Sequence, residues 1–295
     1  MSAEPLVSIV LPTYNGARYL DQSVASCVAQ TYRNWELIIV DDCSTDATPQ
    51  IIAKWVAADP RVRSVRHETN QRLPGGLNTG HRLARGDYLT WTSDDNLYRP
   101  DAIGEMVRFL ESNPDVGLVY ADYTNIDDDG NVMYPHVVAE PQRLAYESCV
   151  GACFLYRRAV WEKVGEYAGD MFLAEDFEYW VRVSQSFKLQ PLHKDLYLYR
   201  LHAGSLTAQR HERVVLAIGR VVERHLPRMD WVPRSYRARG YLVLAGIAER
   251  QGKRALALKH IAQSIRYSPL ELFLRLGRWA KRTAKGRRRS RLPAA

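Results

Sequence analysis

A pair of adjacent carboxylates follows an apolar segment in the first third of the sequence. Asp94 and Asp95 come directly after the run 88–91, and a segment with helical spacing begins at Pro100. Neighbouring carboxylates repel one another unless a cation or a strong donor lies between them. A hard divalent ion such as Mg²⁺ or Mn²⁺, which also holds phosphate oxygens, suits this pair. The alternative is that both residues only cap a turn or the following helix.

Apolar runs alternate with amphipathic segments through the first 120 residues. Short runs rich in β-branched and aromatic residues predict buried strands, and apolar residues at helical spacing predict helices. This alternation is typical of a parallel sheet with helices on both faces. The predicted strands are 6–11, 35–40, 61–66, 88–91 and 116–120, and the predicted helices are 17–30, a helix capped by 44–46, 77–85 and 100–112.

Polar residues at the ends of these strands should gather at one edge of the sheet. Segment 12–14 follows the first strand, Asp42 follows the second, and Asp94 follows the fourth. Ligands of open α/β sheets bind beyond the carboxyl ends of the strands. An exposed backbone with an aromatic ring suits a nucleobase, one carboxylate can accept an N–H, and another can hold a metal. The set predicts a site for a nucleotide with a metal-bound diphosphate.

Four motifs in this order resemble the family 2 inverting glycosyltransferases of the GT-A fold. The resemblance covers about residues 5–205, and its motifs are segments 7–15, 40–46, 78–88 and 93–95. It implies an α/β fold of GT-A type, with a mostly parallel twisted sheet, helices on both faces and a helical C-terminal extension. The implied domains are a catalytic domain, 1–207, with a nucleotide-binding half, 1–120, and an acceptor half, 121–207, followed by a helical region, 208–295.

The resemblance also implies which residues hold the nucleobase. Pro12, Thr13, Tyr14 and Asp42 would bind it, and Arg72 would stack near it or contact it. These positions match the family motifs residue by residue, except that Arg72 lies in a loop predicted between the third strand and the next helix.

The same resemblance places a metal at the acidic pair. Asp94 would reach the ribose, and Asp95 would bind the Mn²⁺ or Mg²⁺ that bridges the diphosphate. Many relatives carry Asp-x-Asp here, and Thr92 stands at the place of the first acid. We therefore expect a metal site of lower affinity, because fewer anionic ligands bind a divalent ion more weakly.

A second acidic pair opens a helix in the segment 171–182. Glu175 and Asp176 precede apolar residues at helical spacing. They could only offset the helix dipole, or one of them could act as a general base. The resemblance assigns the base to Asp176, which would deprotonate the acceptor hydroxyl.

A lone histidine lies in the pattern Tyr-Arg-x-His-x-x-Ser of residues 199–205. His202 is either a buried structural histidine or, by the resemblance, a ligand of the metal or the diphosphate, with Arg200 and Ser205 as companions. Both interpretations stay open at this level.

Basic residues are concentrated at the C-terminus. The net charge is +8, and residues 272–295 contain nine Lys or Arg and no acid, so the rest of the chain is close to neutral. Segment 270–291 mixes these charges with Phe273 and Trp279, which suits peripheral contact with an anionic membrane. A solvated tail and a nucleic-acid contact are the alternatives, and we expect no nucleic-acid partner.

The expected function is transfer of a sugar from a nucleotide-diphosphate sugar to an acceptor hydroxyl. Family frequency favours a uridine nucleotide, and the acceptor would be a polysaccharide or a lipid-linked glycan. No run of 18 apolar residues and no secretory signal pattern is present, so we expect a cytoplasmic location, with peripheral contact at the inner face of the membrane. The alternative is a non-catalytic module that binds a nucleotide sugar or a glycan and uses its helical tail to bind a partner.

Overall fold

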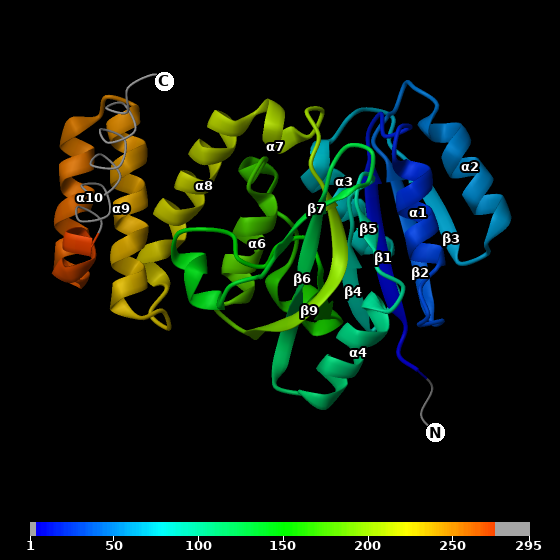
Figure 1. Ribbon diagram of the computed structural model, residues 1–295, viewed down its shortest axis with the longest axis horizontal. Coiled ribbons are helices and arrows are strands. Elements are labelled where there is room, and N and C mark those ends of the chain that lie inside the picture. Colours follow the sequence, from blue (N-terminus) through cyan, green and yellow to red (C-terminus); the bar gives the residue numbers. More distant parts are fainter. Residues whose placement is uncertain (1–3, 275–295) are drawn as a thin grey trace, which may run out of the picture. The chain divides into compact units, whose positions relative to one another are not determined.

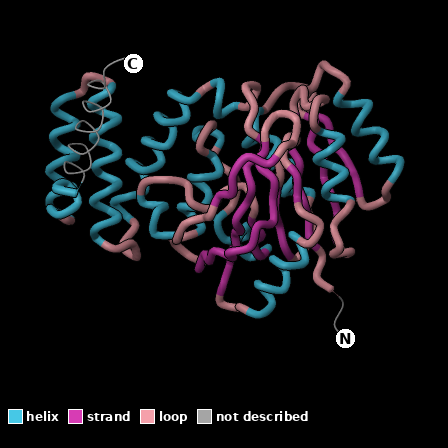
Figure 2. The backbone as a smooth tube through the Cα atoms, viewed as in Figure 1, coloured by secondary structure: helices cyan, strands magenta, loops and turns pink. Residues whose placement is uncertain are grey.

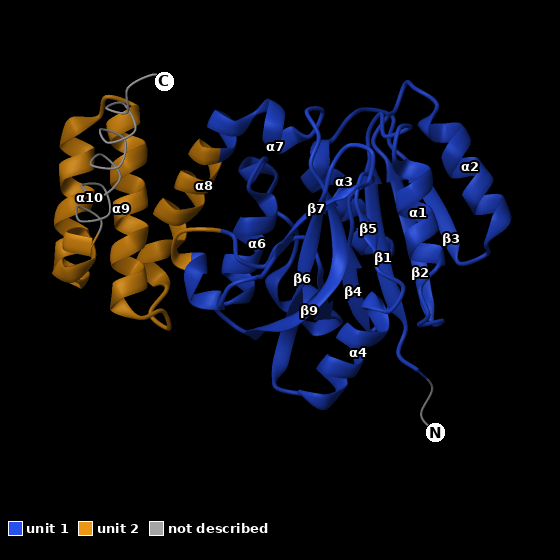
Figure 3. Cartoon of the chain, viewed as in Figure 1, with its two compact units in different colours: residues 1–144, 148–214 blue, residues 145–147, 215–295 orange. Residues whose placement is uncertain are grey.

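The computed structural model describes residues 4–274, and the part of the basic tail from residue 275 onward lies outside them (Figure 1). The chain divides into two compact units (Figure 3). The first unit consists of residues 1–144 and 148–214, and the second of residues 145–147 and 215–295. Among the described helices, none is long and apolar enough to cross a membrane.

A nine-stranded sheet forms the centre of the first unit (Figure 2). Its order is β3-β2-β1-β4-β8-β6-β9-β5, and β7 pairs with β6. Strands β1 to β4 are parallel, and β8 joins this half to β6 by antiparallel pairing on both sides. The strands are β1 (Val7–Thr13), β2 (Trp35–Asp41), β3 (Val62–Arg66), β4 (Tyr88–Trp91), β5 (Leu97–Tyr98), β6 (Val116–Ile126), β7 (Val132–His136), β8 (Phe154–Arg157) and β9 (Lys188–Arg200).

Strands β1 and β2 are buried along their whole length. Apolar residues therefore occupy both faces of these strands, as expected for parallel strands covered by helices on both sides. The α/β fold predicted from the alternation of segments is confirmed, with a sheet whose strand pairs are parallel from β1 to β4 and mixed in the other half. The helices of the first unit are α1 (Leu20–Val28), α2 (Thr48–Ala58), α3 (Arg72–Leu83), α4 (Ala102–Ser112), α5 (Arg158–Val164), α6 (Glu175–Val183) and α7 (Leu206–Gln209).

Helix α3 begins at Arg72, whereas the sequence predicted a loop through residue 76 and a helix from residue 77. The sequence prediction was wrong here because the glycines and the proline of this segment are typical of a loop. Proline is tolerated in a first turn, and the glycines allow close packing on β1. A Cβ at Gly80 would lie 2.2 Å from a methyl carbon of Val10, and one at Gly76 would lie 3.1 Å from the Cβ of Pro12.

The second unit contains an antiparallel helical hairpin, α9 (Arg234–Arg250) and α10 (Arg254–Tyr267). Helix α8 (His211–His225) begins in the first unit and continues into the second. After α10 the described chain returns to α9, where Glu271 is buried and pairs with Arg239 at 2.8 Å.

Candidate active site

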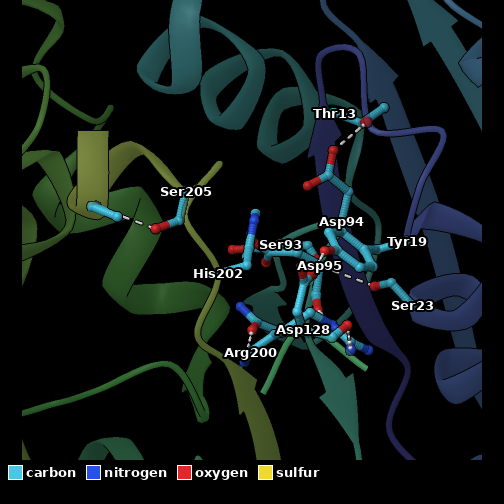
Figure 4. Close-up of polar contacts among 12 residues, drawn as sticks. Thr13, Tyr19, Ser23, Ser93, Asp94, Asp95, Asp128, Arg200, His202 and Ser205 are labelled. Carbon is cyan, nitrogen blue, oxygen red and sulfur yellow. Dashed lines mark hydrogen bonds and ion pairs between the residues drawn. The ribbon is translucent and has the colours of Figure 1, made fainter. Parts of the chain in front are cut away.

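The carboxyl ends of β1, β2 and β4 bring three predicted site residues to one edge of the sheet. The hydroxyl of Thr13 donates to Asp94 Oδ2 at 2.5 Å (Figure 4). The backbone N–H of Asp42 donates to the carbonyl of Thr13 at 2.9 Å. Thr13 therefore links the ends of all three strands. The sequence analysis predicted that these residues lie together, because the carboxyl ends of parallel strands lie at one edge of the sheet.

Gly16 allows Asp94 to approach the loop after β1. A Cβ at this position would lie 2.1 Å from Asp94 Oδ2 and 2.4 Å from the hydroxyl oxygen of Thr13. Burial, together with the neighbouring charge of Asp95, raises the pKa of Asp94 to about 7. This carboxyl group can therefore donate or accept a hydrogen bond near neutral pH.

Asp95 and His202 meet across the site. His202 Nε2 lies 3.0 Å from Asp95 Oδ2, and the imidazole packs edge-on against Tyr19 at 5.0 Å between ring centroids. The other oxygen of Asp95, Oδ1, is buried and has no hydrogen-bond partner among residues 4–274. His202 therefore remains a predicted ligand of a metal or of a diphosphate, and it lies beside Asp95.

Asp95 and His202 offer a small set of donor atoms for a metal ion. Within the described chain, no three His, Cys, Asp or Glu side chains form a metal-binding cluster. Mg²⁺ and Mn²⁺ are nevertheless often held by one or two protein ligands plus substrate phosphates. The partnerless Oδ1 of Asp95 and the imidazole of His202 fit that smaller donor set.

Arg200 has a structural role, although the sequence made it a companion of His202 in ligand binding. Its side chain is buried, and it donates to the carbonyls of Asp95 at 2.9 Å and Asp128 at 2.8 Å. It also donates to the side chain of Gln22 at 2.8 Å. The guanidinium is thereby occupied in fixing the backbone of Asp95. Ser205, the other companion, caps α7 by accepting from the N–H of Ala208 at 3.2 Å.

Asp42 is held by a short chain of polar groups. Its Oδ1 lies 2.7 Å from His67 Nδ1 and accepts from the N–H of Gln71 at 2.7 Å. His67 Nε2 in turn lies 3.0 Å from the hydroxyl of Thr79. One carboxylate oxygen is therefore fixed, and Oδ2 makes no hydrogen bond to the described residues. Through that oxygen, Asp42 can accept a hydrogen bond from a ligand.

Strained backbone is concentrated in the loops of this site. Among the described non-glycine residues, four have a positive φ, which costs on the order of 1 kcal/mol or more each. They follow β1, follow β2, begin α3 and precede α6, and are Asn15, Cys43, Arg72 and Leu173. Strain of this kind is typical of functional sites, where the surrounding structure holds it in place.

Arg72 and Arg210 lie against the ring of the same residue, Phe172. Their guanidinium carbons are 5.4 Å and 5.7 Å from its centroid, within the range of a cation–π contact. This brings the start of α3 to the loop before α6. Tyr14 is 51% exposed and available to a ligand, whereas Pro12 is buried under α3.

Glu175 and Asp176 begin α6, as predicted. Glu175 Oε2 accepts from the N–H of Leu173 at 2.7 Å, and Asp176 Oδ1 accepts from the N–H of Phe177 at 2.7 Å. Burial and the charge of Asp176 raise the pKa of Glu175 to about 8, and burial raises that of Asp176 as well. Burial of both side chains, together with their mutual proximity, therefore favours the protonated form of Glu175 at neutral pH.

Tyr199 connects the two acidic pairs. Burial, followed by the charges of Asp95 and then Asp176, raises the pKa of its hydroxyl. Charges interact more strongly in the interior of a protein than in water, because the effective dielectric constant is lower. The charges of Asp95 and Asp176, which come from opposite halves of the catalytic sequence, thus both contribute to the raised pKa of Tyr199.

The loop before α6 is held in place by α3. Asn78 donates from its side-chain amide to the carbonyl of Tyr167 at 3.0 Å and accepts from its N–H at 2.8 Å. The ring of Tyr167 stacks on Tyr179 of α6 at 4.1 Å. Behind it, burial lowers the pKa of His81 to about 4, so this imidazole is neutral and accepts from the hydroxyl of Tyr156 at 2.6 Å.

A family model described as glycosyl transferase family 2 matches residues 8–173, more than half of the chain. This chain belongs to glycosyl transferase family 2. The predicted family is confirmed, and the match covers the strand ends, the acidic pair of β4 and the start of the loop before α6.

Two curated relatives of this family 2 glycosyltransferase are uncharacterized. Protein y4gI of Sinorhizobium fredii is 31% identical over 255 residues, which are 79% of this chain and 28% of that protein. Glycosyltransferase RP339 of Rickettsia prowazekii is 30% identical over 217 residues, 69% of this chain and 66% of that protein. The chain thus spans less than two thirds of the length of either relative.

Two solved structures share the fold of this family 2 glycosyltransferase. Mannosyltransferase PcManGT from Pyrobaculum calidifontis, in complex with GDP-Man and Mn²⁺, matches with a TM-score of 0.65 at 19% identity, over 92% of this chain and 88% of that one. S. aureus TarS 1-349 in complex with UDP matches with a TM-score of 0.60 at 18% identity, over 83% and 71%. The predicted GT-A fold is confirmed.

Several residues of the site gave no signal in the sequence. The contact of Asp42 with His67 and the contacts of Phe172 with Arg72 and Arg210 join segments that are distant in the sequence. Gly16 was detectable in principle, because a glycine after a strand end often marks a close backbone approach.

Proposed function

We propose that this protein is an inverting glycosyltransferase that moves a sugar from a nucleotide-diphosphate sugar to an acceptor hydroxyl. The observations that carry the proposal are the pairing of Asp95 with His202 at 3.0 Å and the hydrogen bond from Thr13 to Asp94 at the ends of the parallel strands. An inverting transfer needs a group that stabilises the leaving diphosphate and a base on the opposite side of the sugar. Asp95 would serve the leaving diphosphate, and Asp176 would be the base.

The nucleotide would bind at the strand ends. Pro12, Thr13 and Tyr14 would line the base, and the free oxygen of Asp42 would accept its N–H. The carboxyl group of Asp94, held by Thr13, would bond a ribose hydroxyl. Thr13 and Asp42 are buried, which supports specific recognition of the nucleotide. A buried polar group is costly when it is unpaired, so it favours a ligand that supplies the matching hydrogen bond.

Arg72 would contact the nucleotide from the start of α3. Its guanidinium already lies against Phe172, 5.4 Å from the ring centroid. A planar guanidinium can stack on a base and still donate to a phosphate. This placement supports a role for Arg72 between the base and the diphosphate.

Asp95 and His202 would hold a divalent ion, Mn²⁺ or Mg²⁺, together with the diphosphate of the donor. When bound, such an ion supplies Lewis-acid stabilisation of the charge on the leaving group. The protein residues contribute the rest: Arg200 fixes the backbone of Asp95, and Tyr19 fixes the orientation of the imidazole. The complex of PcManGT with GDP-Man and Mn²⁺ supports this assignment.

Asp176 would be the general base. Its carboxylate takes the proton of the acceptor hydroxyl as that oxygen bonds to the anomeric carbon, and the bond from this carbon to the diphosphate oxygen breaks with its electrons leaving on the diphosphate. Glu175 stays protonated at neutral pH and so does not compete for the proton. Positioned proton removal contributes about 10²–10⁴-fold to the rate.

The donor would be a uridine-diphosphate sugar, and the acceptor a polysaccharide or a lipid-linked glycan presented at a membrane, which segment 270–291 would contact. The complex of TarS with UDP supports the nucleotide. The cationic sequence of the tail supports an anionic surface.

A thermal-shift panel tests the donor site. The protein is melted with UDP, TDP or GDP, each with and without Mn²⁺, because a ligand at a hundred times its dissociation constant stabilises by about 2.7 kcal/mol. We expect a metal-dependent shift with UDP. No shift with any nucleotide would contradict the proposal.

Donor turnover tests the transfer reaction itself. We expect slow release of UDP from a UDP-sugar in the absence of acceptor. Nucleotide binding without any release, over a range of donor sugars, would instead assign the protein to non-catalytic sugar-nucleotide binding.

A further inference from the structure

The outward face of α10 exposes an apolar arc. Leu258 is 66% exposed and Ile265 is 44% exposed, and Ala255 and Ala262 are exposed as well. At 100° per residue these four positions fall within one quarter of the helix circumference. The opposite arc is buried and includes His260, whose ring stacks on Tyr241 of α9 at 6.3 Å.

Basic residues border this arc on both sides. Arg254 lies at one edge, and Lys259 and Arg266 lie at the other, by the same helical spacing. All three are exposed, and none forms an ion pair with another described residue. Helix α10 contains no Asp or Glu. The face therefore combines an apolar centre with a positive rim.

The chain that follows α10 continues this character. Leu270, Phe273 and Leu274 are 62%, 70% and 45% exposed. The acid of this stretch, Glu271, is buried in its ion pair with Arg239, so it adds no negative charge to the surface. Beyond the described residues, the sequence adds nine Lys or Arg and no acid.

We propose that the outward face of α10, defined by Arg254, Leu258, Lys259, Ile265 and Arg266, docks on an anionic lipid bilayer. Helices that lie in a membrane interface have an apolar face bordered by Lys and Arg. The long cationic side chains can reach lipid phosphates while their stems lie along the acyl boundary. The inference is independent of the proposed transfer reaction, because it concerns the second unit alone.

Other occupants fit this face less well. A nucleic acid would pair with the cations but would leave the apolar centre without a partner. A second copy docked face to face would bring the two positive rims together, which costs electrostatic energy. An anionic bilayer satisfies the charges and the apolar centre at the same time.

Vesicle flotation with the full chain tests the proposal. Binding is measured to vesicles of phosphatidylcholine with a quarter phosphatidylglycerol and to vesicles of phosphatidylcholine alone, at 0.1 M salt and without donor sugar. Each basic residue at an anionic surface contributes a factor of about five. We expect Lys259→Glu with Arg266→Glu to lower the partition coefficient at least about twentyfold, and Leu258→Ser with Ile265→Ser to lower it about tenfold.

Matched variants control for charge and apolarity. Arg33→Glu with Arg85→Glu removes two exposed cations, and Val132→Ser with Met133→Ser removes two exposed apolar side chains, both from the first unit. We expect these variants to bind as the wild type does. The melting temperature of each α10 variant should be unchanged, because the substituted side chains are exposed.

Three outcomes would overturn the proposal. The first is a wild-type protein that does not float with anionic vesicles. The second is a pair of α10 variants that bind as the wild type does, which would leave the cationic tail as the sole membrane contact. The third is a dimer, seen by light scattering without lipid and dissociated by the α10 variants, which would assign the face to a second copy of this chain.

Discussion

The carboxylate of Asp95 lies 3.0 Å from the imidazole of His202, although 107 residues separate them in the chain. The second carboxylate oxygen of Asp95 is buried without a partner among the described residues. A buried polar atom is costly unless it is paired. This pair is the site at which we propose that a cation binds together with the donor.

Asp95→Asn keeps the shape of the side chain and removes its charge. We expect UDP affinity in the presence of Mn²⁺ to fall at least tenfold, about 1.4 kcal/mol, with no change in the absence of metal. Isothermal calorimetry with and without Mn²⁺ measures both. Asp129→Asn, at an exposed turn, is the control, and an equal metal response in Asp95→Asn would rule out the site.

Asp176→Asn removes the proposed base and keeps a side-chain oxygen that can accept from Phe177. We expect kcat for transfer to fall about 10²–10⁴-fold, while the dissociation constant of the donor changes little. Steady-state transfer and nucleotide binding are measured on the same preparation. Full activity in this variant would refute the base assignment, and Asp129→Asn again controls for loss of a carboxylate.

Gly16→Ala inserts a carbon where Asp94 and Thr13 meet. Because that carbon would lie 2.1 Å from Asp94 Oδ2, the carboxyl group must move. We expect nucleotide affinity to fall about tenfold or more, and the free energy of unfolding to fall by about 1–3 kcal/mol, as for other overpacked sites. Gly169→Ala is the matched control, because a Cβ there meets no atom within 4 Å.

The pH dependence of stability should reveal Glu175. Its pKa is about 8 in the folded protein and near 4.5 when unfolded, so the folded state binds more protons between these values. Stability from this group is therefore complete below about pH 4.5 and is lost as the pH rises to 8.

Glu175→Gln should flatten that dependence. We expect the difference in unfolding free energy between pH 5 and pH 8, measured by urea titration, to shrink by more than about 1.4 kcal/mol, the value of one pKa unit. Glu162→Gln, on the exposed side of α5, should leave the profile unchanged. Identical profiles for the wild type and Glu175→Gln would show that the Glu175 pKa is not raised.

Arg200→Lys should damage both stability and metal-dependent binding. A single ammonium cannot reproduce the contacts of the guanidinium with Asp95, Asp128 and Gln22. At about 1 kcal/mol per lost hydrogen bond, we expect a loss of about 2–3 kcal/mol in unfolding free energy. Arg82→Lys, an exposed arginine paired with Glu166, is the control. Unchanged Mn²⁺-dependent UDP binding would show that Arg200 does not position Asp95.

The sequence alone was sufficient to predict the strands of the parallel half of the sheet. Strands of β-branched residues that end at polar residues identify both their own positions and the edge where Thr13, Asp42 and Asp94 meet, because parallel strands share one carboxyl edge. The helix at Glu175 was also predictable from apolar spacing. These features depend on local patterns that each segment carries by itself.

The tertiary structure decided what those residues do in detail. Helix α3 starts at Arg72 because Gly76 and Gly80 let it pack against β1, a contact that no local pattern contains. The guanidinium of Arg200 donates hydrogen bonds to the backbone carbonyls of Asp95 and Asp128, so this buried side chain stabilises the fold. The pKa values of Glu175 and Asp94 also depend on burial, which forms only when distant segments pack and exclude water.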